Sequence, residues 1–339
     1  MTPAPAALLP AAPLPALRAR RPARRRAGPA LLAGAALALA ALAAANHRRA
    51  ARAEGANPPL GEVMDLGGVR LHVVERGPEA PQGDPVVILH GNGSMVEDPV
   101  ASGLVDALAA RRRVLAFDRP GFGHSSRPRG RPWTAGRQAD LLALALDRLG
   151  VGRATVLGHS WGCLVALALA RRHPARVGAL VLESGYHFAT PRADVLVMAP
   201  PALPVLGDIW RHTGAPLLAG LLWPRLVGKL FAPTPVAPSW ARVPRDMALR
   251  PSQLRAAAEE SALMIPEAWA ASRHHGALLV PLAIVAGAGD RMADPEAQSR
   301  RLHESVPGSH LEIVPGQGHM LHHTALDAVL RAVERVAPL

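Results

Sequence analysis

The stretch Val156–Ala170, VLGHSWGCLVALALA, decides the fold, because a buried-strand pattern ends in it where an apolar helical pattern begins. At the junction Ser160 stands between Gly158 and Gly162, in the pattern G-x-S-x-G. So tight a strand-to-helix turn needs glycine on both sides, since a Cβ atom at either place would clash. The turn projects the serine hydroxyl at a helix N-terminus, whose free N–H groups favour negative charge. The stretch therefore predicts a nucleophilic serine at a strand–turn–helix corner.

A serine hydroxyl is a weak nucleophile unless a base takes its proton. In this architecture the order along the chain is serine, then acid, then histidine. His319, in VPGQGHM, follows the last predicted strand in a glycine loop and is the expected base. Asp290, in VAGAGD, follows the preceding strand and is the expected acid that orients the imidazole. Glu183, which ends the strand in VLESG, is the alternative acid.

The oxyanion formed during acyl transfer needs two backbone N–H donors. Trp161, the residue directly after the nucleophile, is expected to provide one of them. Asn92, in the loop HGNGS that follows the apolar strand PVVILHG, is expected to provide the other. The predicted site is thus assembled from four segments that lie far apart along the chain.

Strand and helix patterns alternate from about Val63 onward, which predicts βαβ units and a mostly parallel sheet with helices on both faces. The alternation stops between about residues 184 and 276, where proline is frequent and four of the six tryptophans lie. Short helices inserted between two halves of a sheet are typical of a lid over a substrate pocket. We therefore expect one α/β domain over residues 63–339, with a helical lid at about 184–276.

The net charge of +12 suggests nucleic-acid binding until its distribution is considered. Residues 1–53 hold nine arginines and no acidic residue, so the rest of the chain carries only three of the twelve excess positive charges. A globular part this balanced does not favour a nucleic-acid partner. The single cysteine, Cys163, excludes an internal disulfide and a multi-cysteine metal site, and its apolar surroundings predict a small buried residue. No metal or cofactor is predicted.

The first 62 residues divide into three segments of different composition. Residues 1–26 contain mainly proline, alanine and arginine without periodicity, and are expected to be disordered. Residues 27–45, AGPALLAGAALALAALAAA, carry no charge, and residues 46–62 are expected to be a linker. The uncharged segment decides where the protein is located.

Three interpretations of residues 27–45 remain open. A transmembrane anchor fits the length of about 20 apolar residues. A cleaved signal peptide would end at the small residues 43–45 and give a secreted protein. The third interpretation is an alanine-rich helix, or untranslated sequence if Met64 is the true start, and the latter would give a cytoplasmic protein. Six arginines before the segment and three after it favour an N-terminus inside, with the folded domain across the membrane.

The motifs HGNG, DRPGFGHS, GHSWG and GAGD…GQGHM occur in this order and together resemble the α/β-hydrolase superfamily. The resemblance covers about Val63 to the C-terminus and is to the lid-bearing branch of esterases, haloperoxidase-like hydrolases, epoxide hydrolases and haloalkane dehalogenases. It implies an eight-stranded mostly parallel sheet and no required cofactor. It also implies a triad of Ser160, His319 and Asp290, with the oxyanion held by the amides of Asn92 and Trp161.

The residue at the strand–turn–helix corner, called the nucleophile elbow, distinguishes branches of the superfamily. Epoxide hydrolases and dehalogenases of this type carry an aspartate there, whereas this chain has Ser160, which favours acyl transfer to serine. We expect a serine hydrolase acting on an apolar carboxylic ester or related acyl compound, of unknown oligomeric state. A proline-iminopeptidase-like peptidase and a carbon–carbon bond hydrolase are alternatives within enzymes. A ligand-binding receptor with a hydrolase fold is the alternative outside them.

Overall fold

The computed structural model describes residues 1, 2, 4 and 27–339. Residues 1–26 are expected to be disordered, and all of them except residues 1, 2 and 4 lie outside the described part. The chain divides into two compact units, Met1–Leu39 and Ala40–Leu339. Helix α1 (Ala27–Ala56) begins in the first unit and ends in the second, which holds all the other helices and strands described below.

One eight-stranded sheet runs through the second unit, in the order β1-β2-β4-β3-β5-β6-β7-β8. The pairs β1–β2 and β2–β4 are antiparallel, and every other neighbouring pair is parallel. The mostly parallel eight-stranded sheet predicted from the sequence is therefore confirmed. The strands are β1 (Glu62–Asp65), β2 (Arg70–Arg76), β3 (Val86–Leu89), β4 (Val114–Phe117), β5 (Ala154–His159), β6 (Val177–Glu183), β7 (Leu282–Gly287) and β8 (His310–Val314).

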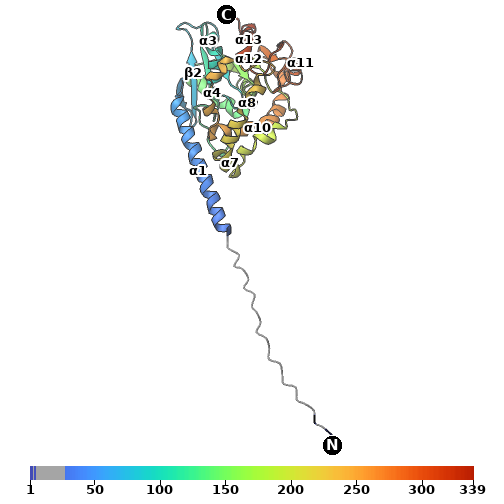
Figure 1. Ribbon diagram of the computed structural model, residues 1–339. Coiled ribbons are helices and arrows are strands. Elements are labelled where there is room, and N and C mark those ends of the chain that lie inside the picture. The colour runs from blue at the N-terminus through green and yellow to red at the C-terminus, as the bar shows by residue number, and fades with distance from the viewer. Residues whose placement is uncertain (3, 5–26) are drawn as a thin grey trace. The chain divides into compact units, whose positions relative to one another are not determined.

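Helices cover both faces of the sheet, so the inner strands β3 to β7 are buried throughout and consist of nearly continuous apolar runs. On one face α4 (Ala135–Arg148) packs against α5 (Trp161–Arg172), and their leucines, valines and alanines form the larger core with the strands. On the other face α3 (Leu104–Ala109) and α13 (Leu326–Val336) lie side by side over a second core (Figure 1).

The chain between β6 and β7 forms helices and adds no strand to the sheet. The longest, α10, begins with Pro251, whose fixed φ suits the first helical position. Figure 1 shows α7 and α10 at the end of the domain opposite to α3 and α13. The action of this segment as a lid stays a prediction. The helices are α6 (Asp194–Met198), α7 (Leu206–His212), α8 (Gly214–Phe231), α9 (Arg245–Ala248) and α10 (Pro251–Ser272).

A buried ion pair attaches α10 to the sheet. The Arg119 guanidinium, in the loop after β4, binds the Glu260 carboxylate of α10, and neither side chain is exposed to solvent. Gln138 of α4 donates its amide to the same carboxylate at 2.9 Å, and Arg119 also donates to the backbone oxygens of His90 and Gly91. Since removing one partner would leave an uncompensated buried charge, this pair fixes α10 relative to the loop after β3.

Helix α1 continues through most of the segment that the sequence predicted as a linker. The buried Asn46 side chain donates to the backbone oxygens of His212 and Thr213 at 2.9 and 2.7 Å. Ala53 is buried against the domain, and Glu54 pairs with Arg250 at 2.7 Å. Residues 46–54 lack proline and glycine, so the helix continues until Gly55 and Pro58 end it. Only residues 57–61 connect α1 to the sheet without helix or strand.

Candidate active site

Ser160 lies at the turn between β5 and α5, with φ +52° and ψ −117°. A non-glycine residue with this backbone is strained and persists only where its surroundings hold it. A Cβ at Gly162 would lie 2.2 Å from the Leu89 carbonyl oxygen, and one at Gly158 would lie 2.7 Å from the Gly162 oxygen. The two glycines therefore allow the helix to start directly above the neighbouring strand, and the corner has the form predicted from the sequence.

His319 and Asp290 lie together at the carboxyl ends of β8 and β7. Nδ1 of His319 donates to Oδ2 of Asp290 at 2.7 Å, and both side chains are buried. The other Asp290 oxygen accepts the backbone N–H groups of Met292 and Ala293 at 2.7 and 3.0 Å. Burial raises the pKa of Asp290, but the His319 imidazole and these two N–H groups outweigh burial and hold it below its usual value. The carboxylate thus fixes the ring and leaves Nε2 of His319 as the nitrogen available to a substrate.

Ser160 and His319 line the same cavity, whose volume is about 200 Å³. The His319 loop is held there by its backbone N–H, which donates to the Leu230 oxygen of α8 at 3.1 Å. In the described part of the chain, Oγ of Ser160 and Nε2 of His319 do not form a hydrogen bond with each other. Such a contact is often long before substrate binds, so a shared cavity is the informative relationship.

The loop after β3 passes close to the serine. A Cβ at Gly91 would lie 3.1 Å from the Ser160 Cβ, so a side chain there would have to displace its neighbours by a few tenths of an ångström. Asn92 is fixed by its side-chain amide, which donates to the Ala257 oxygen and to Ser261 Oγ, both on α10. Within residues 27–339, the backbone N–H groups of Asn92 and Trp161 have no acceptor. The fold therefore uses neither N–H group, and their binding of an oxyanion stays a prediction.

Glu183, the alternative acid, binds a different histidine. Its Oε1 accepts the ring Nδ1–H of His322 at 2.6 Å and the backbone N–H of the same residue at 3.0 Å. Nε2 of His322 donates to Asp98 at 3.0 Å, and His323 donates to the same Asp98 oxygen at 2.8 Å. His322 and His323 are thus members of a buried ionic network. Pairing across segments 139 and 224 residues apart leaves no local sequence signal.

Opposite charges stabilise this network. Burial lowers the pKa of His322, but the carboxylates of Glu183 and Asp98 outweigh burial and raise it to about 10. Burial raises the pKa of each carboxyl, and the facing imidazole outweighs that effect and holds both below their usual values. His322 is therefore an imidazolium held between two carboxylates, of which Asp98 also lines the Ser160 cavity.

The same network contains the cluster that most resembles a metal site among the described residues. The ligand atoms of Asp98, His159 and His322 lie within 4.8 Å of one another. However, both ring nitrogens of His322 already donate to carboxylates, and Nε2 of His159 bonds the His319 oxygen at 3.1 Å. Burial lowers the pKa of His159 to about 4, so this ring is neutral. The charged imidazole of His322 takes the place that a metal cation would have, and this accounts for the close approach of the three side chains.

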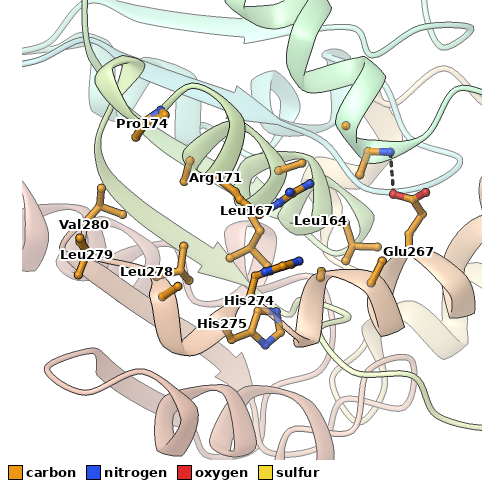
Figure 2. A pocket seen from close by; sticks show the side chains of 17 residues that line it. Leu164, Leu167, Arg171, Pro174, Glu267, His274, His275, Leu278, Leu279 and Val280 are labelled. Carbon is orange, nitrogen blue, oxygen red and sulfur yellow. Dashed lines mark hydrogen bonds between the residues drawn. The ribbon is translucent and has the colours of Figure 1, made fainter.

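A larger cavity, of about 420 Å³, lies away from these residues between α5, α10 and the segment 274–280. Figure 2 shows Leu164 and Leu167 of α5 facing His275 and Leu278 across it, with Glu267 at one side. The Glu267 carboxylate accepts the backbone N–H of Ala135 at 3.0 Å, which caps α4. None of Ser160, Asp290 and His319 lines this cavity, so the candidate site lies at the smaller one.

Residues 84–326 match the family described as the alpha/beta hydrolase fold. The chain belongs to the α/β-hydrolase fold family. The matched residues include the loop after β3, the elbow and both partners of the histidine–aspartate bond, so the family extends across the whole candidate site. The resemblance identified from the sequence motifs is confirmed.

Relatives in this family have several kinds of named activity. The chain is 32% identical over 156 residues to 2-hydroxymuconate semialdehyde hydrolase of Pseudomonas putida, covering 46% of this chain and 54% of that protein. It spans about half the length of the first curated relatives it matches. An enol-lactonase from Burkholderia xenovorans shares the fold with a TM-score of 0.61, at 24% identity over 80% of this chain and 98% of the other. A membrane phospholipase A does so with a TM-score of 0.61, at 22% identity over 90% and 96%.

Proposed function

We propose that this protein is a serine hydrolase that cleaves a carboxylic ester or a related acyl compound through an acyl-enzyme. One observation carries the proposal: His319, oriented by Asp290 at 2.7 Å, shares a cavity with a serine on a strained G-x-S-x-G corner. The three residue types, their order along the chain and their position at the carboxyl ends of parallel strands together support a catalytic triad.

In the proposed reaction, Ser160 Oγ attacks the acyl carbon while Nε2 of His319 takes its proton. Asp290 keeps the proton of Nδ1 in place and stabilises the imidazolium that forms. The backbone N–H groups of Asn92 and Trp161 stabilise the oxyanion, and His319 then returns the proton to the leaving group. Water attacks the acyl-enzyme by the same route and releases the acid and the free serine.

The cavity supports an apolar acyl or alcohol group. Trp223, Val227 and Leu230 of α8 line it opposite the serine, together with Met264 of α10. Its volume of about 200 Å³ is smaller than the 300–1,000 Å³ typical of sites for drug-sized ligands. A substrate with a compact group at the reacting end fits best.

A second candidate is hydrolysis of a carbon–carbon bond, and the 32% identity to 2-hydroxymuconate semialdehyde hydrolase favours it, because that protein's named substrate is a semialdehyde and not an ester. A peptidase and a non-catalytic binding protein are further outcomes. Dehalogenase-type chemistry with a carboxylate nucleophile is disfavoured, since Ser160 occupies the nucleophile position.

The protein is further proposed to be anchored in a membrane by its N-terminal helix. Residues Pro29–Ala56 form a helix long and apolar enough to span a bilayer by length and composition, with a mean hydropathy of 1.8 over its most apolar window. Asn46 and Ala53 lie after the cleavage site expected at residues 43–45, so their contacts with the domain fit both a retained anchor and a cleaved signal peptide. The arginines directly after the apolar segment favour the anchor, because a signal peptide is normally followed by neutral residues.

The activity test is a substrate panel of p-nitrophenyl esters, aminoacyl amides and β-diketones on the purified protein, with Ser160→Ala as the matched control. We expect the esters to be hydrolysed, with the rate lost in Ser160→Ala. Preferred turnover of β-diketones would favour the carbon–carbon candidate, and turnover of amides the peptidase. If neither protein turned over any member, the binding-protein alternative would replace the proposal.

A further inference from the structure

The helices between β6 and β7 expose an unusual amount of apolar surface. Eleven large apolar side chains between Val197 and Leu222 are at least 37% exposed, against seven among the other described residues from 57 to 339. Val205, Leu206 and Leu221 are 68–70% exposed. We refer to these exposed apolar side chains of residues 197–222 as the cap face. A contiguous segment of this kind marks a surface that meets an apolar partner.

Helix α8 has one apolar side on the cap face and another in the substrate cavity. Leu217, Leu218 and Leu221 are exposed, whereas Trp223, Val227 and Leu230 line the Ser160 cavity. A helix that packs only against its own domain would expose polar residues on its outer side. The leucines on the outer side of α8 are therefore unexplained by the fold.

Basic side chains of α1 border this surface. A groove between α1 and α8 is lined by Arg49 and Arg52 of α1 and by Leu217 and Leu221 of α8. Arg48, Arg49 and Arg52 are all exposed and follow directly on the uncharged segment of α1. Guanidinium groups beside exposed leucines match a phosphate headgroup that lies next to acyl chains.

The position of Asn46 places the last residues of the apolar segment, from Ala40 on, beside the cap face. Its side chain binds the backbone of His212 and Thr213, at the junction of α7 and α8. The six residues before it, Ala40–Ala45, belong to the same compact unit and contain only alanine and leucine. The chain therefore enters the domain beside the two helices that carry most of the cap face.

We propose that the cap face docks onto the surface of an anionic phospholipid bilayer, with the leucines of α7 and α8 among the acyl chains and the arginines of α1 at the headgroups. Met198 of α6 is exposed and also lines the Ser160 cavity, so a lipid-borne acyl compound would reach the serine from this side. The proposal of a docking face depends on the proposed membrane anchor but not on the proposed hydrolase activity. The proposal of a lipid-borne substrate depends on both.

The test uses the full chain in vesicles, with an NBD fluorophore on a cysteine introduced as Leu218→Cys or Leu206→Cys. Leu144→Cys is the matched control, since Leu144 is a 57% exposed leucine on α4, far from the cap face in sequence. The wild-type chain controls for labelling of Cys163, which is buried and whose thiol has a pKa raised well above its usual value by burial and by Glu183. Vesicles contain phosphatidylcholine with or without phosphatidylglycerol, and brominated lipids serve as quenchers.

We expect the probes at 218 and 206 to shift to shorter wavelength and to be quenched by brominated lipid, more strongly with phosphatidylglycerol, while the probe at 144 stays water-like. Water-like emission at 218 and 206 in a chain that floats with the vesicles would overturn the docking face and leave the anchor. A shift without quenching would place the cap face against another protein copy and overturn the proposal. A chain that does not float would contradict the anchor and the docking face together, whatever its activity on soluble esters.

Discussion

Glu183 accepts two hydrogen bonds from His322, one from its ring and one from its backbone, and it is therefore not the partner of His319. The ring bond is 2.6 Å and the backbone bond 3.0 Å. Asp290, bonded to His319 at 2.7 Å, is therefore the carboxylate in position to orient the proposed base. The two histidine–carboxylate pairs lie at the same edge of the sheet, and His319 lines the Ser160 cavity whereas Glu183 and His322 do not.

The two carboxylates should respond differently to neutralisation. Asp290→Asn leaves the geometry but favours the wrong tautomer of His319, and we expect kcat to fall by about 10⁴. Glu183→Gln should lower stability and change kcat of the folded protein far less. Steady-state kinetics on the best ester of the panel, normalised to folded protein by circular dichroism, gives both values. A larger kcat loss in Glu183→Gln would reverse the acid assignment.

His322→Gln should be strongly destabilising because it leaves Glu183 and Asp98 buried without a counter-charge. Breaking a buried pair typically costs about 3–5 kcal/mol in the free energy of unfolding. The exposed pair of Asp140 with Arg172 is the control, and Asp140→Asn should cost about 0–1 kcal/mol. Urea unfolding measures both, and equal losses would contradict a charged His322.

The cost of His322→Gln should also depend on pH. The folded pKa of His322 is raised from 6.5 to about 10, so its contribution is fully present below pH 6.5 and is lost as the pH rises towards 10. The difference in unfolding free energy between wild type and variant should therefore shrink between these two values. Unfolding curves at several pH values from 6 to 10 test this, and a difference that grows with pH would refute the imidazolium.

The elbow glycines should be intolerant of a methyl group. In Gly162→Ala the new Cβ would meet backbone at 2.2 Å, and we expect a loss of at least about 1–3 kcal/mol in unfolding free energy. Gly228, in α8, has no atom within 4 Å of its Cβ position, and Gly228→Ala should gain about 0.5–1 kcal/mol. Thermal unfolding compares the pair, and a Gly162→Ala protein as stable as Gly228→Ala would exclude the close approach to β3.

The anchor predicts that charge in the uncharged segment releases the protein from membranes. Each arginine near the centre of a spanning helix costs about 2.5–3.5 kcal/mol of insertion free energy. The double variant Leu32→Arg with Leu37→Arg should shift from the carbonate-washed membrane fraction to the soluble fraction, while Leu32→Val with Leu37→Val should not. Wild type already in the soluble fraction would count against a membrane anchor.

Local patterns were sufficient to predict the sheet and the elbow. Continuous apolar strands, helical periodicity and the glycines around Ser160 act within a few residues, so they are visible in the sequence. The bond between His319 and Asp290 was also predictable, because strand ends of a parallel sheet meet at one edge. Their catalytic roles remain a proposal.

Features that depend on distant pairing were not predictable. The network of Glu183, His322 and Asp98 joins three segments, and nothing near His322 distinguishes it from a packing residue. The attachment of residues 46–56 to the domain depends on the bonds of Asn46 to the α7–α8 junction, which a linker interpretation could not foresee. The exposure of the cap face likewise follows from how α8 divides its apolar residues between the cavity and the surface.

The most direct test of the account is labelling with a fluorophosphonate, which reacts with a serine only when a base activates it. We predict one adduct per chain, mapped by peptide mass spectrometry to Ser160, absent in Ser160→Ala and strongly slowed in Asp290→Asn. A folded wild-type protein that forms no adduct, or forms it on another serine, would contradict the triad and the hydrolase proposal built on it.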